Sequence, residues 1–315
     1  MRNGSQLASK VVVLVNPNAR AMRADPRLAA RLAVMSEGIA EVIVTEQPDL
    51  PRLAQTIVER QVQTLALCGG DGTGQAVLTA LMRARRPARL PRIALLRGGT
   101  VNTIASNLGV RGSPESLLAA LCMRLRAGSP LPTMRQEVIS VEGRVGFVFA
   151  AALGARFLEL YYDHPRPSLS RAIVLAAEVA WSALVSGRVA ERLFQPTDVR
   201  AILDDNREIV VPAARLIVAS TLTDVGVGMR ICPRARDLPG HFQLLVSALS
   251  PNAMARQLPA VRAGRALVGD NHLDAIVARA ELTFPDEEPY TLDGELFRGA
   301  SLDVRSAGAL EIVRA

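Results

Sequence analysis

The sequence predicts an α/β N-terminal domain built on a doubly wound parallel sheet, followed by a mostly antiparallel β domain that carries a long helix. Short apolar strands alternate with helical segments as far as residue 125, and glycine-rich turns follow two of those strands. Beyond Ala127-Gly128-Ser129-Pro130 this alternation gives way to hairpin patterns. We therefore expect a nucleotide-binding domain over residues 1–130 and a β-rich domain over residues 131–300. The tail, residues 301–315, fits either domain and could return to the first.

In the first domain, buried strands are expected wherever a short apolar run ends in a turn signal. Helices are expected where a cap residue or a proline precedes helical spacing, as at Asp25-Pro26 and Ser113-Pro114. Residues 1–9 read as a loose leader. The expected strands span residues 10–15, 41–45, 65–68 and 92–96, and the expected helices span 25–37, 49–60, 103–108 and 114–125, with a further helix opening after residue 74.

In the second domain, the patterns predict hairpins and two helices. One hairpin turns at Glu142-Gly143 within residues 138–149, and another joins residues 199–203 to 208–211. The longer helix, residues 168–193, is expected to pack its apolar face, with Trp181 in the core; if that face were exposed, it would be where a lipid enters. The other expected strands are 216–220, 243–249, 273–278, 281–284, 302–304 and 310–313, and the shorter helix spans 252–267.

Composition restricts the function classes. The chain has 315 residues and a formal net charge of +7, and ten arginines but one acid lie between Ala80 and Gln136. Such a surface attracts phosphates, anionic lipid headgroups or nucleic acid, although 3% aromatic residues argue against a single-strand nucleic-acid binder. Three widely spaced cysteines give no disulfide framework or metal pattern and fit a reducing cytosol. No stretch is long and apolar enough to span a bilayer.

The most informative stretch runs from Leu65 to Leu81. A buried strand leads into Gly69-Gly70-Asp71-Gly72-Thr73-Gly74 and then into helical spacing. We expect these glycines to allow positive φ angles and close ligand approach, and the helix N-terminus to bind an anion. A carboxylate beside a phosphate is favourable when it holds Mg²⁺, so the turn predicts a site for a nucleotide phosphate and magnesium. The alternative is a tight turn in which Asp71 is a helix cap.

Two further turns follow strands of the same predicted sheet. They are Asn16-Pro17-Asn18-Ala19-Arg20 and Arg97-Gly98-Gly99-Thr100-Val101-Asn102. Because ligands bind beyond the carboxyl ends of strands in such sheets, all three turns should lie on one edge.

A pair of acids lies near the end of the chain, in Leu292-Asp293-Gly294-Glu295. A positioned carboxylate can take a proton from a hydroxyl nucleophile. The alternative is an ordinary hairpin turn, for which Asp-Gly is a common pair.

Together, these positions resemble the diacylglycerol kinase catalytic family, which includes bacterial lipid kinases and sphingosine kinases. An NPxxG-like loop, GGDGT, GTxN and a late DGE occur in the family's order over nearly the whole chain. The resemblance implies an N-terminal domain that binds ATP, a β domain that binds the lipid, and transfer of the γ-phosphate in the cleft between them.

The resemblance also implies roles for individual residues. Asp293 would be the general base with Glu295 beside it, and Asp71 would reach Mg²⁺ directly or through water. The residues that would contact ATP are Asn16, Pro17, Asn18, Arg20, Thr45, Gly69, Gly70, Asp71, Gly72, Thr73, Gly99, Thr100 and Asn102.

The sequence departs from the family pattern at four positions. Arg20 replaces the glycine of the first loop, and Thr103 replaces the aspartate after GTxN. A family aspartate of the magnesium–water network aligns with Glu137, and Pro239 replaces the aspartate of a structural metal site, which is therefore not expected.

We accordingly expect a cytoplasmic lipid kinase that uses Mg·ATP and contacts the inner face of a membrane through its basic stretch, with no nucleic-acid partner. The alternatives are a kinase for a soluble substrate, resembling NAD kinase, and a nucleotide- or lipid-binding regulator without turnover. The sequence leaves open which lipid is used and whether the chain forms a homodimer.

Overall fold

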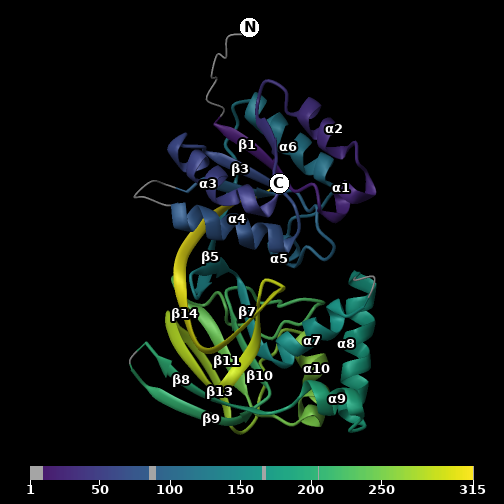
Figure 1. Cartoon of the computed structure of the whole chain (residues 1–315), viewed down its shortest axis with the longest axis vertical. Coiled ribbons are helices and arrows are strands. Elements are labelled where there is room, and N and C mark those ends of the chain that lie inside the picture. Colours follow the sequence, from purple (N-terminus) through teal and green to yellow (C-terminus); the bar gives the residue numbers. More distant parts are fainter. Residues whose placement is uncertain (1–9, 85–89, 165–167, 205, 315) are drawn as a thin grey trace. The chain divides into compact units, whose positions relative to one another are not determined.

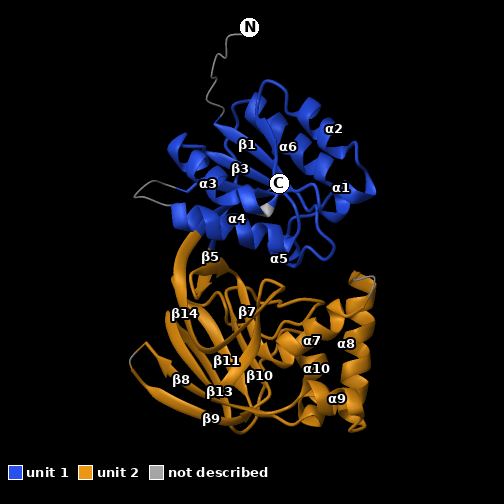
Figure 2. Ribbon diagram, viewed as in Figure 1, with its two compact units in different colours: residues 1–136, 310–315 blue, residues 137–309 orange. Residues whose placement is uncertain are grey.

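The chain folds into two compact units in a computed structural model that describes residues 10–84, 90–164, 168–204 and 206–314. Unit 1 comprises residues 1–136 and 310–315, and unit 2 comprises residues 137–309 (Figure 2). The chain therefore passes from one unit to the other twice, within β5 (Thr133–Val141) and within β14 (Glu295–Val313). The loose leader expected over residues 1–9 lies outside the described residues.

Unit 1 is built on a parallel sheet in the order β2-β1-β3-β4, as the alternating pattern predicts. Figure 1 labels its two central strands, β1 and β3. The last residues of β14 pair with β4, Ile312 opposite Ile93, and are also parallel. Strands β1 and β3 are buried along their whole length, which is why both read as continuous apolar runs. The strands are β1 (Val11–Val15), β2 (Glu41–Val44), β3 (Thr64–Cys68) and β4 (Arg92–Leu95).

The helices of unit 1 form two packed groups. Helix α3 (Leu50–Glu59) packs on α4 (Asp71–Ala84), and α2 (Leu28–Met35) packs on α6 (Pro114–Arg126), as a doubly wound fold requires. Ser113 caps α6 with its hydroxyl, which accepts the Ser116 N–H at 3.2 Å. Two shorter helices are α1 (Arg20–Ala24), which the sequence analysis missed, and α5 (Thr103–Asn107).

Unit 2 contains an antiparallel sheet in the order β12-β11-β10-β7-β13-β14, and in addition β8, which pairs with β9, pairs with β13, and β5, which pairs with β6, pairs with β14. The predicted turn at Glu142 and Gly143 is confirmed, because both residues adopt positive φ angles of 49° and 73°, as this tight hairpin requires. The strands are β6 (Arg144–Gly146), β7 (Val148–Ala152), β8 (Thr197–Leu203), β9 (Glu208–Ala214), β10 (Leu216–Ser220), β11 (Phe242–Ser247), β12 (His272–Val277) and β13 (Arg279–Leu292).

The central strands of unit 2 bury both of their faces. In β10, Ile217 and Ala219 join a core formed by the strands, whereas Leu216 and Val218 join a second core beneath the helices. This explains why β7, β10 and β11 are apolar at consecutive positions although the sheet is antiparallel. The helices of the second core are α7 (Leu153–Tyr162), α8 (Leu169–Leu184), α9 (Arg188–Leu193) and α10 (Pro251–Arg262).

The long helix expected over residues 168–193 is wrong in one respect, because it is two helices. Ser186 adopts a left-handed φ of 54° and ends the first helix, and Gly187 donates its N–H to the Ser182 carbonyl at 2.8 Å. The Ser182 hydroxyl then accepts the N–H of Ala190 in α9 at 2.9 Å. Helix α7 was not expected at all, because neither a capping side chain nor a proline marks its start after β7.

The placement of Trp181 in the core is also wrong. Its side chain lies on α8 and is 67% exposed, while Leu175 and Val179 of the same helix are buried. Among the described residues, no helix is both long enough and apolar enough to cross a membrane.

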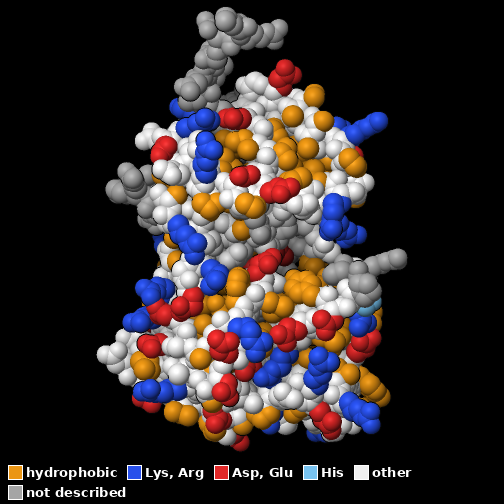
Figure 3. Space-filling view, viewed as in Figure 1, with side chains coloured by type: hydrophobic (Ala, Val, Ile, Leu, Met, Phe, Trp, Pro, Cys, Tyr) orange, Lys and Arg blue, Asp and Glu red, His pale blue; other side chains and the backbone are white. Residues whose placement is uncertain are grey.

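Over unit 2, side chains of both charges are interspersed on the face shown in Figure 3.

Candidate active site

The three predicted turns of unit 1 meet at the carboxyl edge of its sheet. Asn16, after β1, donates its side-chain N–H to the Thr73 hydroxyl at 2.7 Å and so joins the first turn to the glycine turn after β3. Ala21 donates its N–H to the Gly98 carbonyl at 3.0 Å and so joins the first turn to the one after β4. In the strand order β2-β1-β3-β4, β2 lies on one side of β1, and β3 and β4 lie on the other. The position between β1 and β3 is therefore the topological switch point, where ligands bind in such sheets.

The glycines of these turns are needed for packing rather than for positive φ angles. The expectation of positive φ in the Gly69–Gly74 turn is wrong, since none of its residues has one. Instead, a Cβ added to Gly99 would lie 2.4 Å from the Gly70 Cα, and one added to Gly98 would lie 2.9 Å from the Gly69 nitrogen. The two turns therefore touch backbone to backbone, and this contact holds the edge of the sheet together.

Asp71 connects the same two turns through its carboxylate. One oxygen accepts the Thr103 N–H at 2.8 Å and the other accepts the Ile104 N–H at 3.3 Å, so Asp71 caps α5, the helix that follows β4. Burial raises the pKa of the Asp71 carboxyl above its ordinary value of 3.8, although these two N–H groups act to lower it. The alternative that Asp71 is a helix cap is therefore correct. The helix that it caps is α5, whose first residue lies 32 residues further along the chain, and not the helix that follows β3 directly.

Asn102 shapes the turn after β4. It is buried, adopts a left-handed φ of 53°, and exchanges two side-chain hydrogen bonds of 3.0 Å with the backbone N–H and carbonyl of Gly99. Its amide is thus engaged within the turn, and Thr100 lies half-buried between these two residues. The position of an asparagine here is explained by the turn alone, because asparagine tolerates left-handed backbone better than most residues.

The remaining predicted nucleotide residues lie at the same edge. Thr45 is buried directly after β2, and its N–H donates to the Val15 carbonyl at 3.0 Å. In the first turn, Pro17 is half-buried and Asn18 is exposed. Arg20 is exposed and begins α1, so the arginine that replaces the family glycine occupies ordinary helical backbone. Gly72 lies in the first turn of α4.

The structure adds Arg97 to this group, which the sequence analysis left out. Its positive charge acts to lower the pKa of the Asp71 carboxyl, against the larger effect of burial, and its guanidinium donates to the Val110 carbonyl. Arg97 also has a left-handed φ of 51°, which is uncommon outside glycine. The signal available in the sequence was an arginine placed directly before a glycine pair at the end of a strand.

A magnesium ion is implied by the resemblance to kinases, and Asp71 is compatible with it to a limited extent. No group of three or more His, Cys, Asp or Glu side chains suited to a metal occurs among the described residues. Mg²⁺ commonly uses one or two carboxylates together with phosphate oxygens and water. Each Asp71 oxygen accepts one N–H and keeps further acceptor capacity, so this carboxylate fits a shared ion that the phosphates also hold.

The late acid pair forms a two-residue hairpin turn in unit 2. Leu292 pairs with Glu295 across it, and Asp293 and Gly294 adopt φ angles of 51° and 95°. The hairpin alternative therefore describes the backbone correctly, and it leaves the role of the side chains open. Glu295 is exposed, whereas Asp293 is half-buried.

The Asp293 carboxylate is held by the start of β7. Its oxygens accept the Phe147 N–H at 3.0 and 3.1 Å and the Val148 N–H at 2.9 Å. A Cβ added to Gly146 would lie 2.6 Å from an Asp293 oxygen, so glycine at that position leaves room for the carboxylate. The acid is thus fixed in one position by backbone groups on a rigid strand, which suits a positioned base.

Tyr162 supports the same turn from the end of α7. Its hydroxyl donates to the Gly294 carbonyl at 3.0 Å. Tyr161, its buried neighbour, places its ring 5.1 Å from the ring of Tyr162. Helix α7, which was not predicted from the sequence, therefore contributes a side chain to the predicted catalytic turn.

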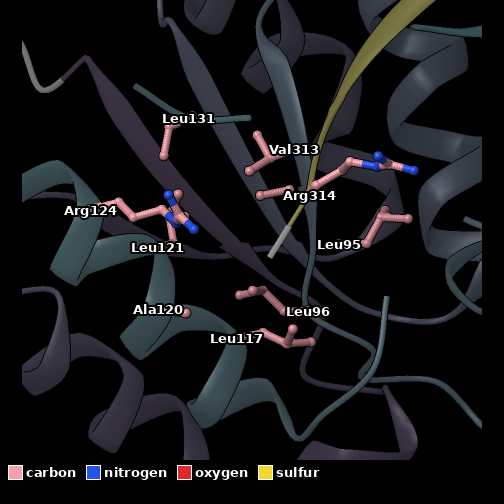
Figure 4. A pocket seen from close by; sticks show the side chains of 10 residues that line it. Leu95, Leu96, Leu117, Ala120, Leu121, Arg124, Leu131, Val313 and Arg314 are labelled. Carbon is pink, nitrogen blue, oxygen red and sulfur yellow. The ribbon is translucent and has the colours of Figure 1, made fainter. Parts of the chain in front are cut away.

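The positions that depart from the family pattern are divided between the two units, with Arg20 and Thr103 in unit 1 and Glu137 and Pro239 in unit 2. Thr103 contacts the Asp71 carboxylate through its backbone N–H and also through its side chain, and both hydrogen bonds act to lower the pKa of Asp71. Glu137 is half-buried in β5, and Pro239 is exposed in the loop before β11. A small pocket in unit 1 is lined by residues of β4, α6 and the end of β14 together with Leu96 and Leu131, and it contains none of the predicted site residues (Figure 4).

Comparison with known proteins tests the resemblance. Residues 10–129 match the family model for the diacylglycerol kinase catalytic domain. This chain carries a diacylglycerol kinase catalytic domain. The match spans β1 to the end of α6 and thus contains all three joined turns.

Curated relatives of this kinase domain cover most of the chain. "Probable lipid kinase YegS-like" from Klebsiella pneumoniae is 26% identical over 286 residues, which are 87% of this chain and 86% of the relative. "Probable lipid kinase YegS" from Salmonella arizonae is 26% identical over 291 residues, which are 91% and 90% of the two chains.

Solved structures show the same fold. A "putative diacylglycerol kinase" from Bacillus anthracis has a TM-score of 0.71 at 14% identity and covers 98% of both chains. A second structure from that organism has a TM-score of 0.69 at 14% identity, covering 98% of this chain and 97% of its own.

These findings confirm the predicted family, the fold class and an ATP-dependent kinase of the lipid kinase class. The roles of the individual site residues and the division of tasks between the two domains stay predictions.

Proposed function

We propose that this protein transfers the γ-phosphate of Mg·ATP to a hydroxyl of a diacylglycerol-like or sphingoid lipid at the cytoplasmic face of a membrane. The observation that carries the proposal is the group of three turns joined through Asn16, Asp71 and the Gly70–Gly99 contact, in the part of the chain that matches a kinase domain. In this proposal unit 1 binds ATP and unit 2 binds the lipid.

Three features of unit 1 suit a triphosphate. Helix α4 begins at Asp71 and presents its N-terminal N–H groups, which attract anions. Gly69 and Gly70 directly before α4 carry no side chains, so phosphate oxygens can approach the backbone there. Arg97 supplies positive charge close to Asp71. Magnesium would be held by Asp71 and the phosphates, and it would neutralise charge that develops during transfer.

The base in this proposal is Asp293. The lipid hydroxyl oxygen forms a bond to the γ-phosphorus while the bond from that phosphorus to the bridging oxygen of ADP breaks, and the hydroxyl proton passes to the Asp293 carboxylate. The N–H groups of Phe147 and Val148 hold the carboxylate in place through this step. Glu295 is exposed beside it and is the second acid to be tested.

The decisive experiment is phosphorylation of a crude lipid extract with γ-labelled ATP, comparing the wild type with Asp293→Asn. Labelled lipid from the wild type alone would support the proposal. Equal labelling by both proteins would remove Asp293 as the base. Label in the water-soluble fraction instead would indicate a soluble substrate.

A second candidate is a nucleotide-binding regulator without turnover. The hydrogen bonds that engage Asp71, Asn102 and Asp293 within the protein favour it, because each of these side chains has a structural task without any ligand. Binding of ATP with no transfer to lipid or to water-soluble acceptors would select this function.

A further inference from the structure

We propose that the exposed face of α8 is the surface with which this protein docks on an anionic phospholipid bilayer, an inference that rests on the proposed lipid kinase function. This docking face consists of Leu169, Ile173, Val174, Ala177, Trp181, Leu184 and Val185. It belongs to unit 2, whereas the basic stretch that the sequence suggested for docking lies in unit 1.

Helix α8 is apolar on both of its sides. Leu175, Val179 and Ala183 pack into the core beneath the helices. On the opposite side, Leu169, Ile173, Ala177, Trp181 and Val185 recur every four residues and therefore form one stripe along the helix. Of these, Ile173 is 51% exposed and Trp181 is 67% exposed. A surface helix normally presents polar residues there, so a continuous apolar stripe indicates an interaction site.

The charges around the docking face suit a bilayer with anionic headgroups. The one charged side chain among the exposed residues of α8 is Glu178, and its carboxylate is paired with Arg171 at 3.1 Å. Arg188 and Arg192 are exposed in α9, which follows directly, against one acid, Glu191. Tryptophan among aliphatic residues, with arginines at the margin, is typical of helices that lie in the plane of a membrane interface.

The docking face is also connected to the predicted catalytic turn within unit 2. Helix α8 packs against α7, and Tyr162 at the end of α7 donates its hydroxyl to the Gly294 carbonyl. A bilayer seated on α8 would therefore lie beside the element that supports Asp293. This continuity favours a lipid surface over a protein partner as the occupant, because the reacting hydroxyl belongs to a bilayer lipid.

Trp181 makes the proposal directly measurable, since it is the only tryptophan of the chain. The full-length protein is mixed with vesicles of phosphatidylcholine containing phosphatidylglycerol, without ATP, and tryptophan emission and co-sedimentation are followed. We expect a blue shift of the Trp181 emission and quenching of that emission by brominated acyl chains. In vesicles rich in phosphatidylcholine, both the blue shift and the quenching should be lost at high salt.

The variants are Ile173→Glu and Trp181→Ala, with Val210→Glu as the matched control. Val210 is 60% exposed on β9, away from α8, so its change adds the same charge to an exposed aliphatic site of the same unit. Vesicle affinity should fall by about tenfold or more for Ile173→Glu, because a charge must enter the apolar interface, and should be unchanged for the control. Circular dichroism checks that each variant is folded.

Three results would overturn the proposal. The first is co-sedimentation with unchanged Trp181 emission, and the second is equal loss in Ile173→Glu and Val210→Glu. The third is a dimer in light scattering without vesicles that Ile173→Glu dissolves, since a second copy would then cover the face. The kinase proposal is judged separately on a water-soluble short-chain diacylglycerol: if the wild type binds vesicles through Trp181 but phosphorylates no such lipid, the proposed function fails and the docking face stands.

Discussion

The contact between the two glycine turns of unit 1 gives the sharpest test of the site. Gly99→Ala would place a Cβ 2.4 Å from the Gly70 Cα and 2.9 Å from the Asn102 side-chain oxygen, whereas ordinary contact begins at 3.4 Å. The nearer atom belongs to the backbone, so a rotamer change cannot relieve the clash and the turns must separate. We expect a loss of about 3 kcal/mol in the free energy of unfolding of unit 1, at the upper end for overpacking.

Gly74→Ala is the matched control, because it adds the same methyl group to the same glycine-rich segment. Gly74 lies inside α4, has no positive φ, and would have nothing within 4 Å of its new Cβ. Alanine there should stabilise the protein by roughly 0.5–1 kcal/mol through helix propensity.

Far-UV circular dichroism in urea measures the stability of both variants, and amide hydrogen exchange over residues 98–104 locates the change. Binding of ATP should weaken in Gly99→Ala and persist in Gly74→Ala. If Gly99→Ala were as stable as the wild type with unchanged exchange in these residues, the inferred backbone contact between the turns would be refuted.

Three further predictions concern the acids and the tyrosine. Asp71→Asn should suppress phosphate transfer and remove the pH dependence of stability that Asp71 causes: burial raises the carboxyl pKa, so the folded state binds the proton more tightly, and the stability contributed by Asp71 is greatest at low pH and falls as the pH rises from 3.8 through the raised pKa. Urea titrations of both proteins between acidic and neutral pH measure this. If the free energy of unfolding of the wild type, relative to that of Asp71→Asn, did not fall with rising pH, the prediction would be contradicted. Asp293→Asn should lower kcat by on the order of 10²-fold or more while ATP binding is unchanged. If Glu295→Gln lowered kcat by the same factor, the assignment of Asp293 alone as the base would be contradicted. Tyr162→Phe should cost about 1 kcal/mol of stability by removing its bond to the Gly294 carbonyl, with a thermal melt and kcat as readouts, whereas an unaltered melt would show that the bond carries little weight.

Local signals in the sequence were sufficient for most elements. Strands β1 and β3 are continuous apolar runs that end in a turn, and α6 begins at a serine cap followed by proline. Where such signals were absent the prediction failed, as at α7, and the stop signal at Gly187 was overlooked, so that two helices were merged into one. The three turns could be assigned to one edge because the carboxyl ends of parallel strands share it.

The contacts that build the site could not be predicted, because they join residues far apart in the chain. Asp71 caps a helix 32 residues later, and Asp293 is held by Phe147, which lies 146 residues earlier. The role of Gly99 depends on Gly70 in another turn, and the glycine pattern indicated positive φ angles in a segment where the structure shows close packing instead. The exposure of Trp181 was missed because the periodicity of an all-apolar helix does not say which side the rest of the chain covers.

By itself, then, the sequence determined the class of fold, the order of the motifs and the kinase family, since these depend on local patterns of side chains and on spacing along the chain. The tertiary structure decided which groups meet: the capping of α5 by Asp71, the cradle of backbone N–H groups around Asp293, and the outward-facing apolar side of α8. The physical reason is that hydrogen bonding and burial depend on neighbours in space, and folding brings those neighbours from distant parts of the chain.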